Sequence, residues 1–177
     1  MKLLITGGVG FIGRYTMRTA LARGNEVVLY DLAVPSGDLP AGVRYVHGEL
    51  SSTDDVLATL EACRPTAIVH LAAVVGVPAS MNSPIESTRV NVEGTVRLLE
   101  AVQRFGPTRV VHLSTEETYG DFEEDSIDED HVQRPFTPYG ISKAAAEGFC
   151  RFFRRTRGVD LGRGISRKAA RHRVRAR

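Results

Sequence analysis

Short apolar runs that alternate with helix-like stretches constrain the fold of this chain more than any other feature. Each run has the length and composition of a strand that is buried on both faces of a sheet. The runs occupy 2–6, 26–30, 43–47, 67–71 and 109–113. Apolar residues with helical spacing occupy 12–23, 54–63, 84–105 and 138–155, whereas 32–42 has the composition of a loop. This order predicts an α/β fold, a doubly wound parallel sheet between two layers of helices (three layers, α/β/α).

A glycine-rich turn follows the first predicted strand and opens the first predicted helix. Gly7, Gly10 and Gly13 have the spacing that a tight turn, a close approach of backbone amides to a pyrophosphate and close helix packing require. Asp31 ends the second predicted strand, where a carboxylate can accept hydrogen bonds from ribose hydroxyls and would repel a 2′-phosphate. Because no lysine or arginine lies between 31 and 43, the pattern predicts a Rossmann-like site for NAD rather than NADP. A degenerate, empty site is the alternative.

Tyr139 and Lys143 are four residues apart on a predicted helix and therefore share one face of it. A lysine ammonium beside a phenol favours the phenolate, so we expect Lys143 to lower the pKa of Tyr139 and make it an acid/base group. Thr115 follows the fifth predicted strand, and its hydroxyl could bind the same substrate oxygen. A Tyr-x-x-x-Lys spacing alone is common, and one turn of a surface helix is the alternative.

Residues 1–157 resemble the extended short-chain dehydrogenases/reductases, most of all the NAD-dependent sugar-nucleotide epimerases and dehydratases. Five ordered motifs carry the resemblance: TGGVGFIG at 6–13, HLAA at 70–73, NVEGT at 91–95, LSTEETYGD at 113–121 and YGISK at 139–143. The resemblance implies that a hydride moves between a sugar carbon and bound NAD. It also implies Tyr139 as the acid/base, Lys143 on the nicotinamide ribose and Thr115 orienting the substrate hydroxyl.

The resemblance also implies a set of cofactor-binding residues along the edge of the sheet. Glu49 and Leu50 stand where the family has an aspartate and an aliphatic residue near the adenine, Ala72 and Ala73 would line the cofactor, and Asn91 would support the middle of the site. The predicted cofactor-binding residues are Gly7, Gly10, Phe11, Ile12, Gly13, Asp31, Glu49, Leu50, Leu71, Ala72, Ala73, Asn91, Tyr139 and Lys143.

Glu116 and Glu117 resemble the Asp-Glu pair that serves sugar-nucleotide 4,6-dehydratases as acid and base for the loss of water. Two neighbouring carboxylates with separated pKa values suit such an elimination. Glu116 is one methylene longer than the aspartate of the motif, which matters where geometry is tight. Dehydration, epimerisation, decarboxylation, simple dehydrogenation and no activity therefore stay open, and an exposed acidic loop is the alternative for the pair.

Charge divides the chain into two parts. Residues 1–150 hold 12 basic and 20 acidic residues, whereas 151–177 hold 11 basic residues and one acidic residue. Nucleic-acid binding through the basic segment is disfavoured, because no aromatic residue occurs in the last 24 residues and no recognised motif is present. The spacing of Cys63 and Cys150 fits no metal or redox motif, and glycines interrupt the apolar start after Ile5. We therefore expect a cytoplasmic protein without a metal or a membrane segment.

The composition changes abruptly near residue 161, and this predicts the domain organisation. We expect an NAD-binding Rossmann domain at 1–160 and an irregular basic tail at 161–177, with the substrate lobe of the family largely missing. A truncated or frame-shifted reading of the gene would explain the change. Two functions follow: an enzyme that acts on a nucleotide sugar, or an NAD-binding module without catalysis. By resemblance, the helices at 84–105 and 138–155 would form a homodimer.

Overall fold

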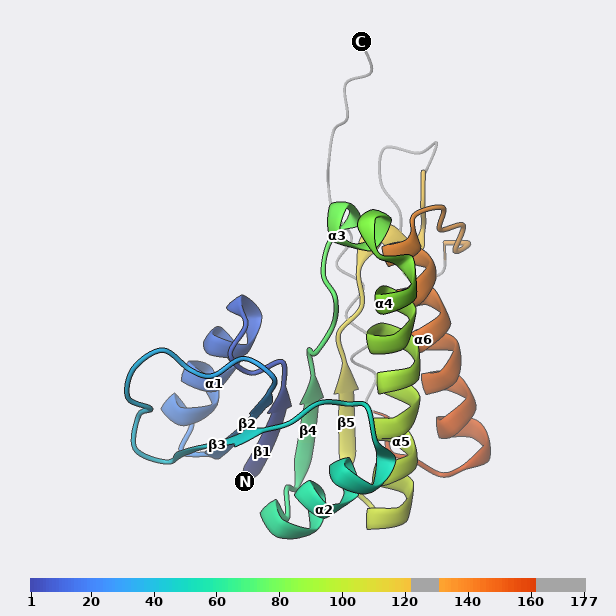
Figure 1. The fold of residues 1–177 in the computed structure, drawn as a ribbon. Coiled ribbons are helices and arrows are strands. Elements are labelled where there is room, and N and C mark those ends of the chain that lie inside the picture. The colour runs from blue at the N-terminus through green and yellow to red at the C-terminus, as the bar shows by residue number, and fades with distance from the viewer. Residues whose placement is uncertain (122–130, 162–177) are drawn as a thin grey trace.

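A five-stranded parallel sheet forms the centre of the molecule in the computed structural model, which describes residues 1–121 and 131–161. The strands are β1 (Lys2–Thr6), β2 (Glu26–Asp31), β3 (Val43–His47), β4 (Ala67–His70) and β5 (Arg109–His112). They lie in the order β3-β2-β1-β4-β5, so the chain starts in the middle of the sheet and winds outward in both directions (Figure 1). The predicted fold class is confirmed, and all five strands lie within one residue of their predicted ends.

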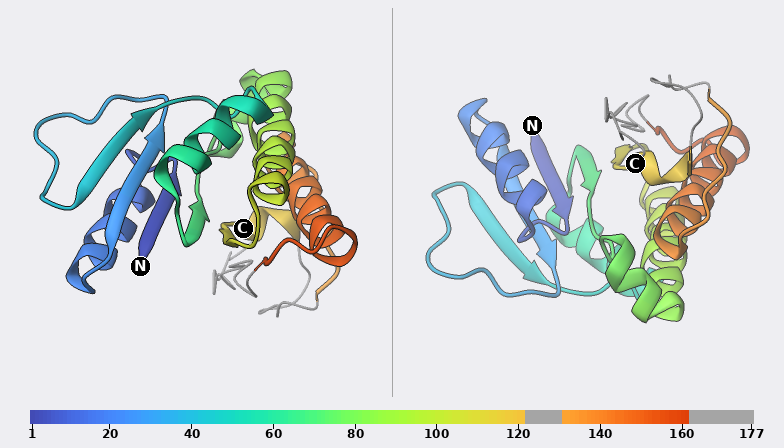
Figure 2. Two further views of the ribbon diagram at one scale, coloured as in Figure 1. Left: turned by 90° about the horizontal axis from the view of Figure 1, so that it is seen from below. Right: turned by 90° about the horizontal axis from the view of Figure 1, so that it is seen from above.

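Helices cover both faces of the sheet. They are α1 (Phe11–Ala22), α2 (Thr53–Cys63), α3 (Val77–Asn82), α4 (Pro84–Thr88), α5 (Gly94–Phe105) and α6 (Pro138–Thr156), with the π-helical turn η1 (Arg89–Glu93) and the 3-10 turn η2 (Glu116–Thr118). Figure 2 shows α1 on one side of the sheet and α2, α5 and α6 on the other. This division follows from right-handed crossovers that run in opposite directions across the sheet: α1 connects β1 to β2, whereas α2 and α5 connect β3 to β4 and β4 to β5.

The strands are apolar on both faces because each face meets helices. Leu3 and Ile5 of β1 pack with Met17 of α1 in one core cluster. Leu4, between them in sequence, packs in the other cluster with Leu60 of α2 and with residues of α5 and α6. Successive side chains of a strand point to opposite faces, so an unbroken apolar run fills both cores.

The helical pattern at 84–105 predicted one helix, and this is wrong in detail. The structure has α4, then η1, then α5, so a π-helical turn interrupts the stretch at Arg89–Glu93. Such turns add a residue to the helical register and often occur at functional sites. The sequence analysis also missed α3, which starts at the Val77-Pro78 pair after Gly76, a glycine with φ of +94°.

The start of α6 is fixed by three polar and steric contacts. The Thr137 hydroxyl accepts a hydrogen bond from Gly140 N at 3.0 Å, and Pro138 stands at the first helical position, where a missing N–H costs nothing. Ser80 of α3 accepts a hydrogen bond from Tyr139 N at 3.1 Å. A Cβ on Gly140 would lie 2.3 Å from the Glu117 carbonyl oxygen, so only glycine lets α6 approach η2 this closely. These contacts place Tyr139 beside the end of β5.

The outer edge of β5 meets the last described residues of the chain. Leu161 is buried and forms an isolated parallel bridge with Val110, and Asp160 forms an ion pair of 3.0 Å with Arg109. The chain therefore begins a sixth position of the sheet at this edge. Beyond Leu161, the predicted basic tail lies outside the described residues.

The core on the α2, α5 and α6 side should dominate stability. Ile68 of β4, a strand paired on both sides, is 0% exposed, so we expect Ile68→Ala to lower the free energy of unfolding by about 2–5 kcal/mol, since it removes buried methyl groups and leaves a cavity. Urea denaturation followed by circular dichroism measures the change. Val34→Ala, at a loop residue that is 71% exposed, is the control and should stay within about 0.5 kcal/mol of the parent. A loss in the Ile68 variant as small as that of the control would contradict this packing.

Candidate functional site

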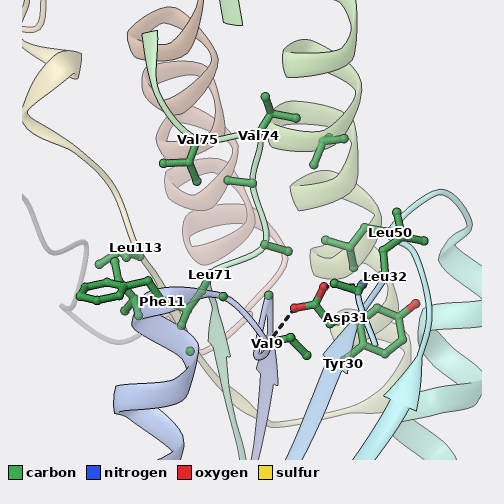
Figure 3. A pocket seen from close by; sticks show the side chains of 18 of the residues that line it. Val9, Phe11, Tyr30, Asp31, Leu32, Leu50, Leu71, Val74, Val75 and Leu113 are labelled. Atoms are coloured by element: carbon green, nitrogen blue, oxygen red, sulfur yellow. Dashed lines mark hydrogen bonds between the residues drawn. The ribbon is translucent and has the colours of Figure 1, made fainter. Parts of the chain in front are cut away.

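A cavity of about 820 Å³ lies at the carboxyl ends of the strands. Figure 3 shows Phe11, Leu71 and Leu113 toward one end of it and Tyr30, Asp31 and Leu50 toward the other. It is lined by the glycine-rich turn and by the segments that follow β2, β3, β4 and β5, together with residues of α4, η1 and α6. This is the crevice where open parallel sheets bind their ligands.

The glycine-rich turn needs glycine for steric reasons that the structure makes explicit. Gly7 has φ of +68°, and a Cβ on it would lie 2.6 Å from Ala72 N of the segment after β4. A Cβ on Gly13 would lie 2.5 Å from the Gly8 carbonyl oxygen, so α1 could not start so close to the turn. Both glycines bring backbone to backbone, as the sequence predicted for a phosphate-binding turn.

Asp31 connects the glycine-rich turn to the end of β2. Its Oδ2 accepts a hydrogen bond from Val9 N at 2.8 Å, and its Oδ1 accepts one from Ala33 N at 2.9 Å (Figure 3). Each carboxylate oxygen can accept a further hydrogen bond, so Asp31 can hold the turn and still receive ribose hydroxyls. Its negative charge stands in the cavity wall at the position the sequence predicted.

The start of α1 supplies unpaired backbone donors to the same cavity. Gly10 caps the helix without a side-chain hydrogen bond, and the first turn, which begins at Phe11, contains no acidic residue. The first N–H groups of a helix have no partner within it and carry the positive end of its dipole. Since Gly10, Phe11, Ile12 and Gly13 all line the cavity, this end is open to a phosphate group.

The structure brings nearly all the predicted cofactor-binding residues to one cavity. Asn91 is the exception, because it is buried and does not line the cavity. Its side chain binds the backbone of Val74 through Oδ1 at 2.8 Å and Nδ2 at 3.1 Å, and Nδ2 also donates to Ser142 Oγ at 2.9 Å. Asn91 therefore holds the wall after β4 against α6, in keeping with a supporting place in the site.

Arg89 is a cavity residue that the sequence analysis missed. Its guanidinium forms an ion pair of 2.7 Å with Glu49 and one of 2.8 Å with Glu86, and all three residues line the same end of the cavity wall as Leu50. These contacts raise the pKa of Arg89, chiefly through its hydrogen bonds to Glu86 and Glu49. The three-residue spacing between Glu86 and Arg89 on a helix was a sequence signal for their ion pair. Glu49 is distant from Arg89 in sequence, so no local spacing indicated the second ion pair.

Tyr139 lies beside Thr115, as predicted, but its pKa moves in the other direction. Burial raises the pKa of Tyr139, the Glu116 and Glu117 charges raise it further, and a side-chain hydrogen bond with Thr115 opposes them. The expectation that Lys143 lowers this pKa is therefore wrong for this structure. The physical reason is that burial and the two glutamate charges determine the direction of the shift, while the Lys143 ammonium contacts His112.

The two neighbouring glutamates point to different surroundings. Glu116 is exposed and lines the cavity with Thr115 and Tyr139. Glu117 does not line the cavity, and its Oε2 accepts a hydrogen bond from the Thr137 hydroxyl at 3.2 Å. The structure therefore brings Glu116 to the predicted catalytic group and places Glu117 against the start of α6.

A polar row crosses the sheet below the cavity. Thr6, His70 and His112 are aligned on three neighbouring strands. His70 Nδ1 lies 2.7 Å from the Thr6 hydroxyl and Nε2 lies 2.9 Å from the Thr95 hydroxyl, which itself donates to the Asn91 carbonyl oxygen at 2.7 Å. Thr95 therefore accepts from Nε2–H, and Thr6 donates to Nδ1. Burial lowers the pKa of His70 to about 3, so the ring is neutral.

Lys143 and Glu147 extend this buried polar region onto α6. Lys143 is 4% exposed and its Nζ lies 3.2 Å from His112 Nε2. Glu147 has a fully buried side chain that accepts hydrogen bonds from the Ser114 hydroxyl and from Gln133 Nε2, the latter at 2.9 Å. Glu147 was not among the residues predicted for the site. The four-residue spacing from Lys143 to Glu147 was the available signal for Glu147.

The described residues show no metal cluster and no membrane span. Within residues 1–121 and 131–161, histidine, cysteine, aspartate and glutamate side chains form no group of three that could hold a metal ion. None of the helices described in this part of the chain is both long and apolar enough to cross a bilayer.

Comparison with known proteins identifies the family. The family model described as GDP-mannose 4,6 dehydratase matches residues 4–171. The chain is 36% identical to a dTDP-glucose 4,6-dehydratase from Streptomyces niveus over 91% of this chain and 52% of the relative. It is 30% identical to a CDP-paratose 2-epimerase from Salmonella typhi over 90% of this chain and 55% of the relative. The chain thus spans about half the length of the curated relatives it matches.

Solved structures are similar in fold as well as in sequence. The UDP-glucose 4-epimerase from Thermus thermophilus, solved as a complex with NAD, has a TM-score of 0.85 and 34% identity, covering 91% of this chain and 53% of that one. The dTDP-glucose 4,6-dehydratase DesIV from Streptomyces venezuelae, solved with NAD bound, has a TM-score of 0.83 and 35% identity, covering 91% and 54%. With the extent of the family match, these likenesses show that the chain belongs to the GDP-mannose 4,6 dehydratase family of NAD-dependent sugar-nucleotide epimerases and dehydratases.

Proposed function

We propose that this chain binds NAD and carries the oxidoreductase half of an enzyme that epimerises or dehydrates a nucleotide sugar. One observation carries the proposal: a single cavity is lined both by the glycine-rich turn with Asp31 and by Thr115, Tyr139 and Lys143. A dinucleotide must reach from a phosphate-binding turn to a catalytic group, and the cavity joins the two. Relatives solved with NAD support the choice of cofactor.

The residues of the cavity fit the parts of NAD in order. The α1 N-terminus at Gly10 offers backbone donors to the pyrophosphate. Asp31 would receive the adenosine ribose hydroxyls, and its charge disfavours a 2′-phosphate. Glu49 and Leu50 would flank the adenine, with Arg89 holding the Glu49 carboxylate in place. Lys143 would donate to the nicotinamide ribose.

Tyr139 is the proposed acid/base at the sugar carbon. Bound NAD would supply the hydride acceptor, and its reduced form would return the hydride later. Tyr139 would take the hydroxyl proton as the sugar is oxidised and give it back on reduction, while Thr115 orients the same oxygen. A raised pKa keeps the phenol protonated in this structure, so the charge of a bound, oxidised nicotinamide is needed to favour the phenolate.

The choice between epimerisation and dehydration depends on Glu116. It lines the cavity near Tyr139, where a carboxylate could move a proton during loss of water, whereas the Glu117 carboxylate is held by Thr137. An acid/base pair for dehydration would need Glu117 to leave this contact. Product mass separates the two reactions, because dehydration makes the sugar one water lighter and epimerisation leaves its mass unchanged.

NAD binding without turnover is the second candidate, and a specific observation favours it. Phe11 and Val75 line the cavity and are largely exposed, so the described residues leave this side of the cavity uncovered. Catalysis of this kind depends on excluding water from the reacting atoms. A chain that binds NAD but leaves every nucleotide sugar unchanged would match this candidate.

We include a homodimer and a cytoplasmic location in the proposal. Ile141, Phe149 and Phe152 are exposed on α6 at spacings that share one helix face, next to α5 (Figure 1). An exposed apolar helix face marks an interaction surface. Cys63 and Cys150 are both free and buried, which suits a reducing compartment.

Replacing Asp31 tests the adenosine end of the site. We expect Asp31→Asn to weaken NAD binding about tenfold to a hundredfold, because ribose hydroxyls lose a charged acceptor. The preference for NAD over NADP should narrow, since the repelling charge is gone. Isothermal calorimetry with both nucleotides measures these changes, and Asp38→Asn, in the loop that follows β2 but away from the cavity, is the matched control. Equal NAD affinity in the Asp31 variant and the parent would contradict the assignment.

Replacing Tyr139 tests the chemistry separately from cofactor binding. We expect Tyr139→Phe to keep NAD affinity and to lower turnover of nucleotide sugars by about 10²–10⁴-fold, because the acid/base hydroxyl is lost. Liquid chromatography coupled to mass spectrometry on a panel of UDP-, dTDP- and GDP-sugars gives both rate and product, because epimers of equal mass differ in retention time. Tyr15→Phe, on the exposed face of α1, is the control. Undiminished turnover in the Tyr139 variant would exclude the proposed role.

A charge on the apolar face of α6 tests the dimer. We expect Phe149→Asp to convert the protein from dimer to monomer, because a carboxylate in an apolar interface is left without a partner. Light scattering after size-exclusion chromatography measures the mass. Val34→Asp places the same charge on an exposed loop and should leave the mass unchanged. A monomeric parent protein would refute the dimer outright.

A further inference from the structure

His112 is a buried histidine that the proposed chemistry does not use. It ends β5 on the sheet face covered by α5 and α6, and its Nε2 lies 3.2 Å from Lys143 Nζ. An ammonium group only donates, so Nε2 must accept and the ring proton must sit on Nδ1. Nδ1 is buried and has no partner among the described residues. The ring therefore keeps its contact with Lys143 although this leaves a buried donor unpaired.

Lys143 is the cation of this contact, and the ring is its neutral partner. Burial lowers the pKa of His112 well below its usual value, and the Lys143 charge lowers it further, so the ring is neutral. Burial likewise lowers the pKa of Lys143 to about 8, against the opposing influence of Cys150 and Glu147. The Cys150 thiol, with a pKa raised by burial to about 12, is uncharged at neutral pH. The carboxylate near Lys143 is therefore that of Glu147. It already accepts hydrogen bonds from Ser114, Gln133 and Arg151.

Lys143 stands between His112 and the cavity. Lys143 lines the cavity wall, whereas His112 does not. Within the described part of the chain, the Lys143 ammonium donates its side-chain hydrogen bond to His112 Nε2. The imidazole is therefore placed behind the ammonium, on the side away from the cavity.

We propose that His112 is a positioning residue for Lys143: as a neutral acceptor behind the ammonium, it orients Lys143 Nζ and favours its charged form. One N–H of the ammonium is fixed on the ring, and the others are left for a group bound in the cavity. That this group is a nicotinamide ribose rests on the proposed function. The orientation and charge of Lys143 do not rest on the proposed function, and both can be measured on the protein without a ligand.

Two amides provide a matched pair of variants. In His112→Gln the side-chain oxygen can reach the place of Nε2, whereas in His112→Asn the side chain is one bond shorter and cannot. Both amides are polar and of similar size, so a difference between them reports the acceptor rather than general packing. His47→Gln, at an exposed histidine of β3, is the control. If His112→Asn does not fold, His112→Leu removes the acceptor without adding an unpaired polar group.

The chain has only three lysines, Lys2, Lys143 and Lys168, so their titrations can be followed individually. Lysine labelled with ¹³C at Cε gives three NMR signals, and the signal lost in Lys143→Arg identifies Lys143. We expect the midpoint of Lys143 to stay within about half a unit in His112→Gln and to fall by about one to two units in His112→Asn or His112→Leu. An unchanged midpoint in folded His112→Asn or His112→Leu would overturn the proposal, as would an equal fall in His112→Gln.

The pH dependence of NAD binding is the second readout. In the parent, affinity should decline as the pH rises through about 8, because Lys143 loses its charge. His112→Asn should move this decline to lower pH and weaken binding about tenfold at neutral pH, whereas His112→Gln should follow the parent. A decline at the same pH in both amide variants would overturn the proposal. A parent that binds no NAD at any pH would refute the proposed function, and the lysine titration would still decide the role of His112.

Discussion

Because all five strands run in the same direction, their carboxyl ends meet at one edge of the sheet, and the residues that follow each strand are brought together there. The register makes this concrete. Leu4, Ile68 and Val110 are aligned across β1, β4 and β5 and form part of the apolar core. Two residues further along the same strands, the aligned residues are Thr6, His70 and His112. The same sheet face thus changes from apolar to polar just before the cavity begins.

This change explains why buried polar groups concentrate at one level of the structure. His70 satisfies both ring nitrogens through threonines of β1 and α5, so its burial requires no charge. Among the residues that the structure describes, His112 finds a partner for Nε2 alone, which is Lys143 of α6. An unpaired buried donor costs about 1–3 kcal/mol, and folds retain such groups where another constraint requires them. The constraint visible here is the contact that holds the cavity-lining lysine.

The sequence predicted those parts of the fold and site that depend on local spacing. Gly7, Gly13 and Asp31 follow strands at fixed distances, so their meeting at the cavity could be read from the chain. Arg89 could not be assigned, because its partner Glu49 lies on another segment and the π-helical turn at Arg89–Glu93 has no simple periodic signal. The pKa of Tyr139 was predicted in the wrong direction for a similar reason. Helical spacing places Lys143 on the same face, but only the packing of α6 on β5 shows where its ammonium points.

Arg89 and Lys143, the two basic residues among those that line the cavity, differ in how strongly their surroundings screen their charge. The Arg89 and Glu49 side chains are 39% and 38% exposed, so water and salt screen their ion pair, which contributes about 0–1 kcal/mol. Lys143 is 4% exposed and Glu147 fully buried, so each interaction with them acts in a low dielectric. The end of the cavity at Glu49 can therefore adjust, because its ion pair with Arg89 is exposed to solvent. The end at Tyr139 is more constrained, since Lys143 is buried and its ammonium contacts His112 of β5. Geometry there is set by the sheet itself, through the last residues of a single strand.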